Sequence, residues 1–396
     1  MTADTGLVSM LRVNPFVEKS RELDALFRAA RQRCAEPLTL CGLFEREADA
    51  LCDAHRAGRV AATLVILNGL AEKPGWLACT PASEIDATVL ANELGGAEAR
   101  RAIARWHGFA DWAAATAADR PIDAEFEAAC DAILSGDQAA LSALLTQRPS
   151  LVHARSPFPH GSTLLHYVAA NGIENHRQWQ SPANAARIAQ ILLAAGADPN
   201  ATCTCYGARD TLFGLLLSSA PPAQAGVQAD IVEVLCHAGA QVNGPDDDGA
   251  PLWGAITSGS ADSVERLARC GARVDNVVFA AALGEQQRVR EYFDEAGQLK
   301  PARAKSGERI GLAGPALDST KMLEYALIFA CGNGRREVVE LLLTKHPDLS
   351  VHEPFVEQHC AWPSRVPPPN RDRRTVAPAI APARWWRPVS AAAAPR

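Results

Sequence analysis

One spacing recurs four times along the chain: a glycine is followed by an apolar or aromatic residue five positions later and by another eight positions later. Residues three positions apart lie on the same face of a helix, and glycine commonly ends the helix before it. Each copy predicts an αα-hairpin, which cannot bury its apolar side without a neighbour. The copies are Gly136 with Leu141 and Leu144, Gly259 with Val264 and Leu267, Gly284 with Val289 and Tyr292, and Gly334 with Val339 and Leu342.

Two further patterns keep a fixed order around these hairpins. One opens the shorter helix of a unit, and the other follows the longer helix. Three patterns in constant phase predict an all-α solenoid of stacked units. The openings are TLLH at Thr163, TLFG at Thr211 and PLWG at Pro251, and the endings are GADPN at Gly196, GAQVN at Gly239 and GARVD at Gly271.

The opening of the second unit resembles that of the ankyrin repeat. TLLH at residues 163–166 is followed by AANG at 169–172, with Leu164 where that family usually has proline. The turn at residues 198–200 resembles the family's turn into the next hairpin. The resemblance covers roughly residues 123–350, about six units at a spacing of about 33 residues. It implies that the shorter helices and hairpin tips line a concave recognition groove.

The resemblance also implies roles for individual residues. The side chains of Thr163 and His166 are expected to hydrogen-bond within the opening turn. The inter-helix glycines, Gly136, Gly259, Gly284 and Gly334, are expected to be structural.

A protein partner is the function that this resemblance implies, and insertions in an array often mark its binding face. Extra residues lie around 174–184 and 221–228, and the stretch 300–321 interrupts the array. Trp, Tyr and Arg dominate the energetics of protein interfaces, although Trp253 could instead pack between neighbouring units. The expected partner-binding residues are Trp179, Thr202, Tyr206, Arg209, Asp210, Asp247 and Trp253.

Three regions are expected: a helical N-terminal region at 1–120, the repeat array at 121–350, and a Pro/Arg/Ala-rich tail at 351–396. Within the first, a helix start is expected at Thr80-Pro81, where a Thr N-cap precedes proline. Residues 99–112 resemble a helical element that precedes ankyrin arrays in many bacterial proteins, and the Ala/Arg-rich composition favours a bacterial source.

The tail holds seven arginines and no recognisable closing unit. We expect it to be disordered, with an altered reading frame after Phe355 as an alternative origin. Without a cap, the face that carries Leu341 and Leu342 should be poorly covered, so that this end frays or self-associates.

Composition excludes several classes of protein. A formal charge of −6 argues against a dedicated nucleic-acid binder. The N-terminus carries no secretory signal pattern, and no apolar run is long enough to span a membrane, so a cytoplasmic protein with reduced cysteines is expected.

No cofactor, metal or catalytic residue is expected. The motifs of common hydrolases, metalloproteases and nucleotide-binding loops are missing from the sequence. Cys34, Cys41, Cys52 and His55 lack the paired spacing of a zinc site and are expected to be structural. The acids at 246–248 fit turn chemistry better than a cation site. The alternative function is an enzyme or a thiol- or metal-dependent sensor, in which the N-terminal region or the cysteines Cys203 and Cys205 contribute chemistry.

Overall fold

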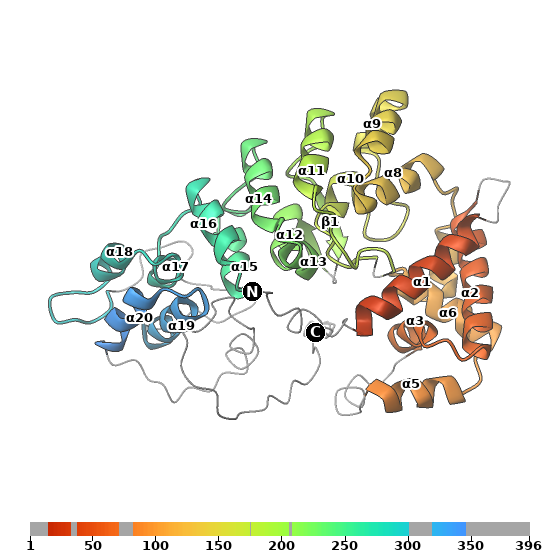
Figure 1. The fold of residues 1–396 in the computed structure, drawn as a ribbon, viewed down its shortest axis with the longest axis horizontal. Coiled ribbons are helices and arrows are strands. Elements are labelled where there is room, and N and C mark those ends of the chain that lie inside the picture. Colours follow the sequence, from red (N-terminus) through yellow and green to blue (C-terminus); the bar gives the residue numbers. More distant parts are fainter. Residues whose placement is uncertain are drawn as a thin grey trace, which may run out of the picture.

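The chain folds into two groups of helices that follow one another along the sequence (Figure 1). The computed structural model describes residues 15–32, 38–70, 82–174, 176–205, 208–300 and 319–345. The first group is a bundle at one end of the molecule, and the second is an array that curves away from it. Within the described residues, no helix has the length and apolar character needed to cross a membrane.

The bundle encloses a core of its own. Leu23, Phe27, Leu43, Phe44 and Ile103 are each at most 1% exposed. Backbone hydrogen bonds join the bundle to the segment before the array, because Leu40 N donates to Arg120 O at 2.9 Å and Ile122 N donates to Leu38 O at 2.7 Å. The helices of the bundle are α1 (Pro15–Gln32), α2 (Leu40–Arg56), α3 (Ala61–Leu70), α5 (Ala82–Ala91), α6 (Gly96–Trp106) and α7 (Trp112–Ala117).

The array consists of stacked helix pairs that share one continuous core from Phe126 to Leu342. The solenoid expected from the sequence is therefore confirmed. The boundaries expected at residues 120 and 350 stay a prediction. The pairs are α8 (Ala124–Ser135) with α9 (Gln138–Gln147), α10 (Leu164–Tyr167) with α11 (Ala185–Ala194), α12 (Leu212–Leu217) with α14 (Gln228–His237), α15 (Ala250–Thr257) with α16 (Ala261–Arg269), α17 (Val277–Leu283) with α18 (Gln286–Glu291), and α19 (Ser319–Gly332) with α20 (Arg336–Leu343).

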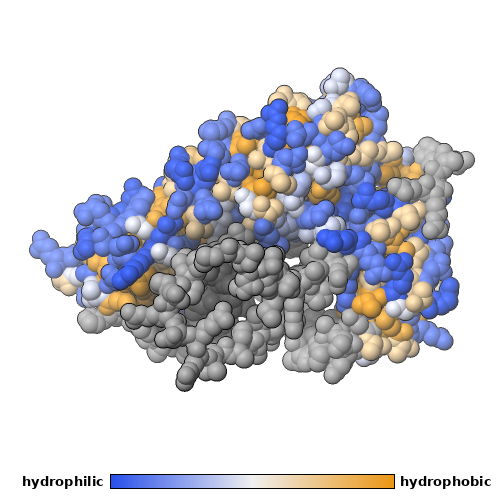
Figure 2. Space-filling model, in the orientation of Figure 1, coloured by the Kyte–Doolittle hydropathy of each residue, from blue (hydrophilic) through white to orange (hydrophobic). Residues whose placement is uncertain are grey.

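The helix pairs form two rows, with α9, α11, α14 and α16 outside and α10, α12, α15, α17 and α19 inside the curve (Figure 1). Hydrophilic residues cover the projecting outer helices (Figure 2). Two short elements accompany the pairs: a 3-10 helix at Pro149–His153 follows α9, and α13 (Ala220–Gln224) lies between α12 and α14.

The inter-helix glycines adopt left-handed backbone conformations, with φ of 79° at Gly136, 68° at Gly259, 79° at Gly284 and 70° at Gly334. An L side chain is strained there, which explains why glycine recurs at this phase. The surroundings differ, because a Cβ at Gly136 would lie 2.5 Å from Asn184 Oδ1, whereas a Cβ at Gly259 would meet open space.

The substitutions Gly136→Ala and Gly259→Ala should therefore have unequal effects. Both introduce backbone strain, but only the first displaces Asn184, whose Nδ2 donates to Gly136 O at 2.8 Å. We expect Gly136→Ala to be the more destabilising by roughly 1–3 kcal/mol. Urea denaturation of the two variants measures the difference, and equal midpoints would contradict this packing.

The structure adds one feature that the sequence did not predict. Strands β1 (Thr202–Cys205) and β2 (Ala208–Thr211) pair antiparallel, with Cys203 opposite Asp210 and Thr204 opposite Arg209. Cys203 and Cys205 face inward and Thr204 faces solvent, so this tip is a β-hairpin rather than an irregular loop.

The far end of the array departs from expectation. Leu342 is fully buried and Leu341 is 8% exposed, because α20 packs against both α18 and α19. The prediction that the face with Leu341 and Leu342 is poorly covered is therefore wrong. Among the leucines of α20, Leu343 is the exposed one, at 46%. The helix start at Thr80-Pro81 and the tail from residue 351 lie outside the described residues, so disorder and an altered reading frame stay predictions.

Candidate functional site

The opening turn of the second unit is fixed by a histidine. Thr163 N donates to His166 Nδ1 at 3.1 Å, and Thr163 Oγ1 lies 2.8 Å from the same nitrogen. Since Nδ1 accepts the backbone hydrogen bond, Nε2 carries the ring proton and donates to Ala201 O at 3.1 Å. His166 therefore couples the opening of one unit to the start of the next hairpin tip.

That tip, the hairpin β1–β2, presents Arg209 to solvent. Arg209 Nε donates to Thr202 Oγ1 across the hairpin at 3.0 Å. Arg155 Nη1 donates to Thr202 O at 2.8 Å and ties the hairpin to the preceding unit. Asp210 is half-buried, and burial raises the pKa of its carboxyl. Tyr206 lies outside the described residues.

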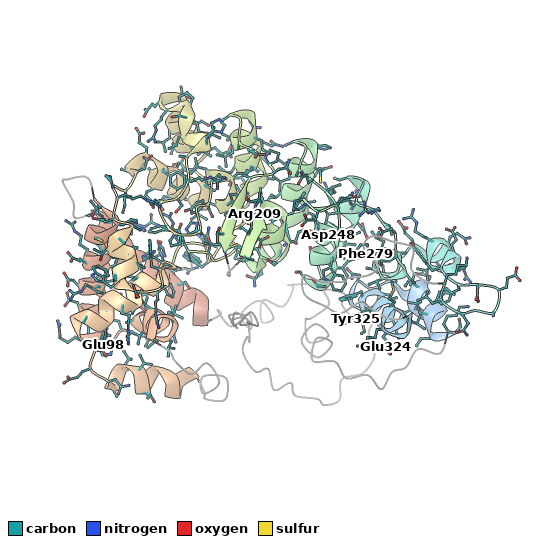
Figure 3. All side chains as sticks on the ribbon, turned by 180° about the vertical axis from the view of Figure 1, so that it is seen from behind. Glu98, Arg209, Asp248, Phe279, Glu324 and Tyr325 are labelled. Carbon is teal, nitrogen blue, oxygen red and sulfur yellow. The ribbon has the colours of Figure 1, made fainter. Side chains whose placement is uncertain are left out.

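The next tip holds the acidic turn. Asp247 has a left-handed backbone, with φ of 52°, and its carboxylate lies 2.8 Å from Arg273 Nη1. Asp248 Oδ1 accepts a hydrogen bond from Ala250 N at 2.9 Å, at the start of α15. Both acids therefore have structural partners. Figure 3 shows Asp248 next along the array from Arg209.

Trp253 projects from α15 and packs against α19. Its ring lies edge-on to Phe329, with centroids 5.3 Å apart, and edge-on to Tyr325 at 6.4 Å. Trp253 and Tyr325 are both half-exposed. The tryptophan thus joins the fourth unit to the sixth and stays partly exposed.

The first part of the insertion, residues 174 and 176–178, is buried rather than projecting as a loop. His176 is fully buried, and Glu174, Arg177 and Gln178 are each at most 4% exposed. Trp179 is half-buried, with the guanidinium carbon of Arg21 from α1 at 4.6 Å above its ring. The first part of the insertion therefore lies between the bundle and the array.

Arg177 is the centre of an ionic network on the array side of this junction. Its Nη1 lies 2.9 Å from Glu127 Oε2, and its Nε lies 2.7 Å from Glu174 Oε2. Glu174 also lies 3.2 Å from His160 Nε2 and accepts a hydrogen bond from the Tyr167 hydroxyl.

The pKa values in this network reflect a competition between burial and pairing. Burial alone would raise the pKa of Glu174, but Arg177 and His160 lower it well below its usual range. For Glu127 burial prevails over Arg177, and the pKa is raised. Burial opposes the charge of Arg177, yet Glu127 and Glu174 raise its pKa well above its usual range. Arg177 is therefore a permanent buried cation.

A second part of the network lies on the bundle side. Glu47 Oε2 lies 2.6 Å from His107 Nε2, and the side chains are at most 1% exposed. The His107 ring stacks on both Phe44 and Phe158, with centroids 4.6 and 4.7 Å away, and these two phenyl rings also stack on each other at 6.2 Å. His176 links the two parts.

His176 touches groups from both sides of the junction. Its Nε2 lies 3.4 Å from Arg31 Nη1, and its ring stands edge-on to His107 at 5.7 Å. Burial, followed by the charge of Arg31, lowers the pKa of His176 well below its usual range, against an opposing effect of Glu174. The imidazole is therefore neutral at the junction.

Little in the amino-acid pattern indicates this network. Glu174 and Arg177 are three residues apart, which fits a local ion pair, but nothing adjacent indicates that Glu47, His107 or Arg31 meets them. Every one of these side chains but the half-buried Arg31 is buried, so the arrangement holds two helical groups together rather than presenting a reactive group.

The candidate zinc residues do not converge. Cys52 Sγ lies 3.9 Å from Leu94 O, and His55 Nε2 lies 3.1 Å from Val89 O. Burial raises the pKa of both Cys41 and Cys52, and Cys34 is outside the described residues. Across the part of the chain that the structure describes, no group of three or more His, Cys, Asp or Glu side chains could hold a metal ion.

Comparison with known proteins identifies one family. Residues 160–204 match the ankyrin repeat, a stretch that runs from the opening turn of Thr163 and His166 through α10 and α11 into β1. A comparison with curated proteins finds no match. Ankyrin repeats mediate protein–protein interactions and are generally not enzymes. Residues 160–204 are therefore an ankyrin repeat, and it stands within an array of stacked helix pairs.

Proposed function

We propose that the protein is a non-catalytic binding module that holds a protein partner against the inner side of its array. Support comes from the ankyrin repeat at 160–204, since such repeats are interaction modules in general. The observation that carries the proposal is the hairpin β1–β2, which presents the exposed Arg209 from a hydrogen-bonded scaffold.

The proposed surface combines two kinds of contact. Arg209, Thr202 and Asp210 supply polar groups at the hairpin β1–β2, and Asp247 adds an acid at the next tip. Trp253 adds a half-exposed aromatic ring, of a residue type enriched among the residues that dominate interface energies. Trp179 is left out of this surface, because its ring packs beneath Arg21 at the bundle junction.

Arg209→Ala should weaken capture of the partner by at least about tenfold, if Arg209 is an interface anchor. The matched control is Arg187→Ala, because Arg187 is likewise an exposed arginine but lies on the outer helix α11. Both variants would be used as full-length bait in lysate of the native host, followed by titration of the captured protein. Trp253→Ala tests the aromatic contact in the same way.

If the Arg209→Ala, Trp253→Ala and unmodified proteins bind the captured protein with equal affinity, the proposed surface is wrong. Loss of binding by Arg187→Ala alone would place the interface on the outer helices instead. The melting temperature of Trp253→Ala must be measured beside its affinity, because Trp253 also packs against Phe329.

A further inference from the structure

Two thiols lie side by side on the inward face of β1. Cys203 Sγ is 3.9 Å from Cys205 Sγ, because residues two apart in a strand point to the same face. Thr204 between them is exposed, and the cysteines themselves are 4% and 6% exposed. The two thiols therefore lie on the buried face of β1, whose other face is exposed at Thr204.

The surroundings of the two sulfur atoms differ. Hydrogen bonding from the Cys205 thiol, with further contributions from His166 and Ser162, lowers the pKa of Cys203. The Cys205 thiol keeps its proton, because Cys203 raises its pKa and so does Asp210, whose Oδ2 lies 3.8 Å away. This asymmetry favours a thiolate on Cys203 beside a thiol on Cys205, the combination that thiol–disulfide chemistry requires.

We propose that Cys203 and Cys205 form a redox modification site, at which a peroxide converts the two thiols into a reversible intrastrand disulfide. The Cys203 thiolate attacks one peroxide oxygen, the O–O bond breaks, and Cys203 becomes a sulfenic acid as hydroxide leaves. The Cys205 sulfur then attacks the Cys203 sulfur and displaces the hydroxyl group, which departs as water with the Cys205 proton. Two thiols and hydrogen peroxide give one disulfide and two waters.

Closure of this bond reshapes the hairpin β1–β2. Strand residues two apart have Cα atoms about 6.4–6.8 Å apart, while disulfides favour about 5.5–6 Å. The bond therefore shortens β1 and disturbs its register with β2, where Thr204 lies opposite Arg209. An effect on partner binding rests on the function proposed above, whereas formation of the disulfide does not.

Peptide mass spectrometry of the full-length protein tests the proposal. Trypsin releases residues 188–209 as one peptide whose only cysteines are Cys203 and Cys205. The protein would be treated with a small excess of hydrogen peroxide, denatured and alkylated. This peptide should then carry no alkyl group, and its mass should be lower by two hydrogens than that of the reduced, unalkylated peptide. Dithiothreitol before alkylation should restore two alkyl groups. Cys130, which is fully buried and whose pKa is raised by burial, should stay alkylated throughout.

The variants separate the two sulfur atoms. Cys205→Ser should leave a sulfenic acid on Cys203 that dimedone traps, while Cys203→Ser should leave Cys205 reduced and alkylated. A 188–209 peptide that keeps two alkyl groups, a Cys203 that proceeds to sulfinic acid in the unmodified protein, or a disulfide between two chains would each overturn the proposal. None of these readouts uses the binding partner, so a failed binding surface and a failed redox site give different results.

Discussion

Arg177→Met is expected to lower the free energy of unfolding by about 3–5 kcal/mol, the usual result of removing one partner from a buried ion pair. The Arg177 side chain is 2% exposed and contacts Glu127 and Glu174. Methionine fills much of the same volume but leaves Glu174 without its strongest stabilising charge. Because the insertion packs against α1, the bundle and the array should lose stability together.

Urea denaturation followed by circular dichroism measures this effect. The matched control is Arg336→Met, which removes the Arg336–Glu340 pair from a surface where the side chains are 85% and 61% exposed. Solvent screens such a pair, so the urea midpoint of Arg336→Met should stay close to that of the unmodified protein. If Arg177→Met unfolds at the same urea concentration as Arg336→Met, the network does not hold the junction.

Acidification should destabilise the protein through His176. The pKa of His176 is lowered in the folded state by burial and by Arg31, whereas in the unfolded chain it is about 6.5. Below that pH the unfolded state binds one more proton than the folded state. Stability that is fully present above about pH 6.5 is then lost as the pH falls toward the folded pKa, by up to about 1.4 kcal/mol per unit.

His176→Gln isolates this contribution, because glutamine cannot take up the proton. Arg31, Glu174, Arg177 and His107 all face the imidazole and remain in the variant. Unfolding free energies at pH 7.5, 6.5 and 5.5 would be compared, a range above the usual pKa of carboxylates. The difference between the two proteins should change with pH below about 6.5, and a constant difference would rule out His176 as the titrating group.

The repeat architecture could be predicted because its signals are local. A glycine such as Gly284, with its left-handed φ, and an apolar pair such as Val289 and Tyr292 specify a turn and a helix face within ten residues. The same holds for Thr163 and His166, which meet inside one turn.

The junction could not be predicted, because its partners are distant in the sequence. Arg177 and His176 are polar residues in an insertion, which usually indicates an exposed loop. Their burial depends on α1 and on Glu127, which no local pattern relates to residues 174–178. The hairpin β1–β2 was missed for a similar reason: four residues of Thr-Cys-Thr-Cys are too short a run to distinguish from a loop.

Hydrogen exchange on the full-length protein with its captured partner locates the binding surface. We expect slower exchange in residues 202–211 and in α15, on the inner side, with no change in α11, α14 and α16 outside (Figure 1). Protection of the outer helices, with unchanged exchange in the hairpin β1–β2, would contradict the proposed surface.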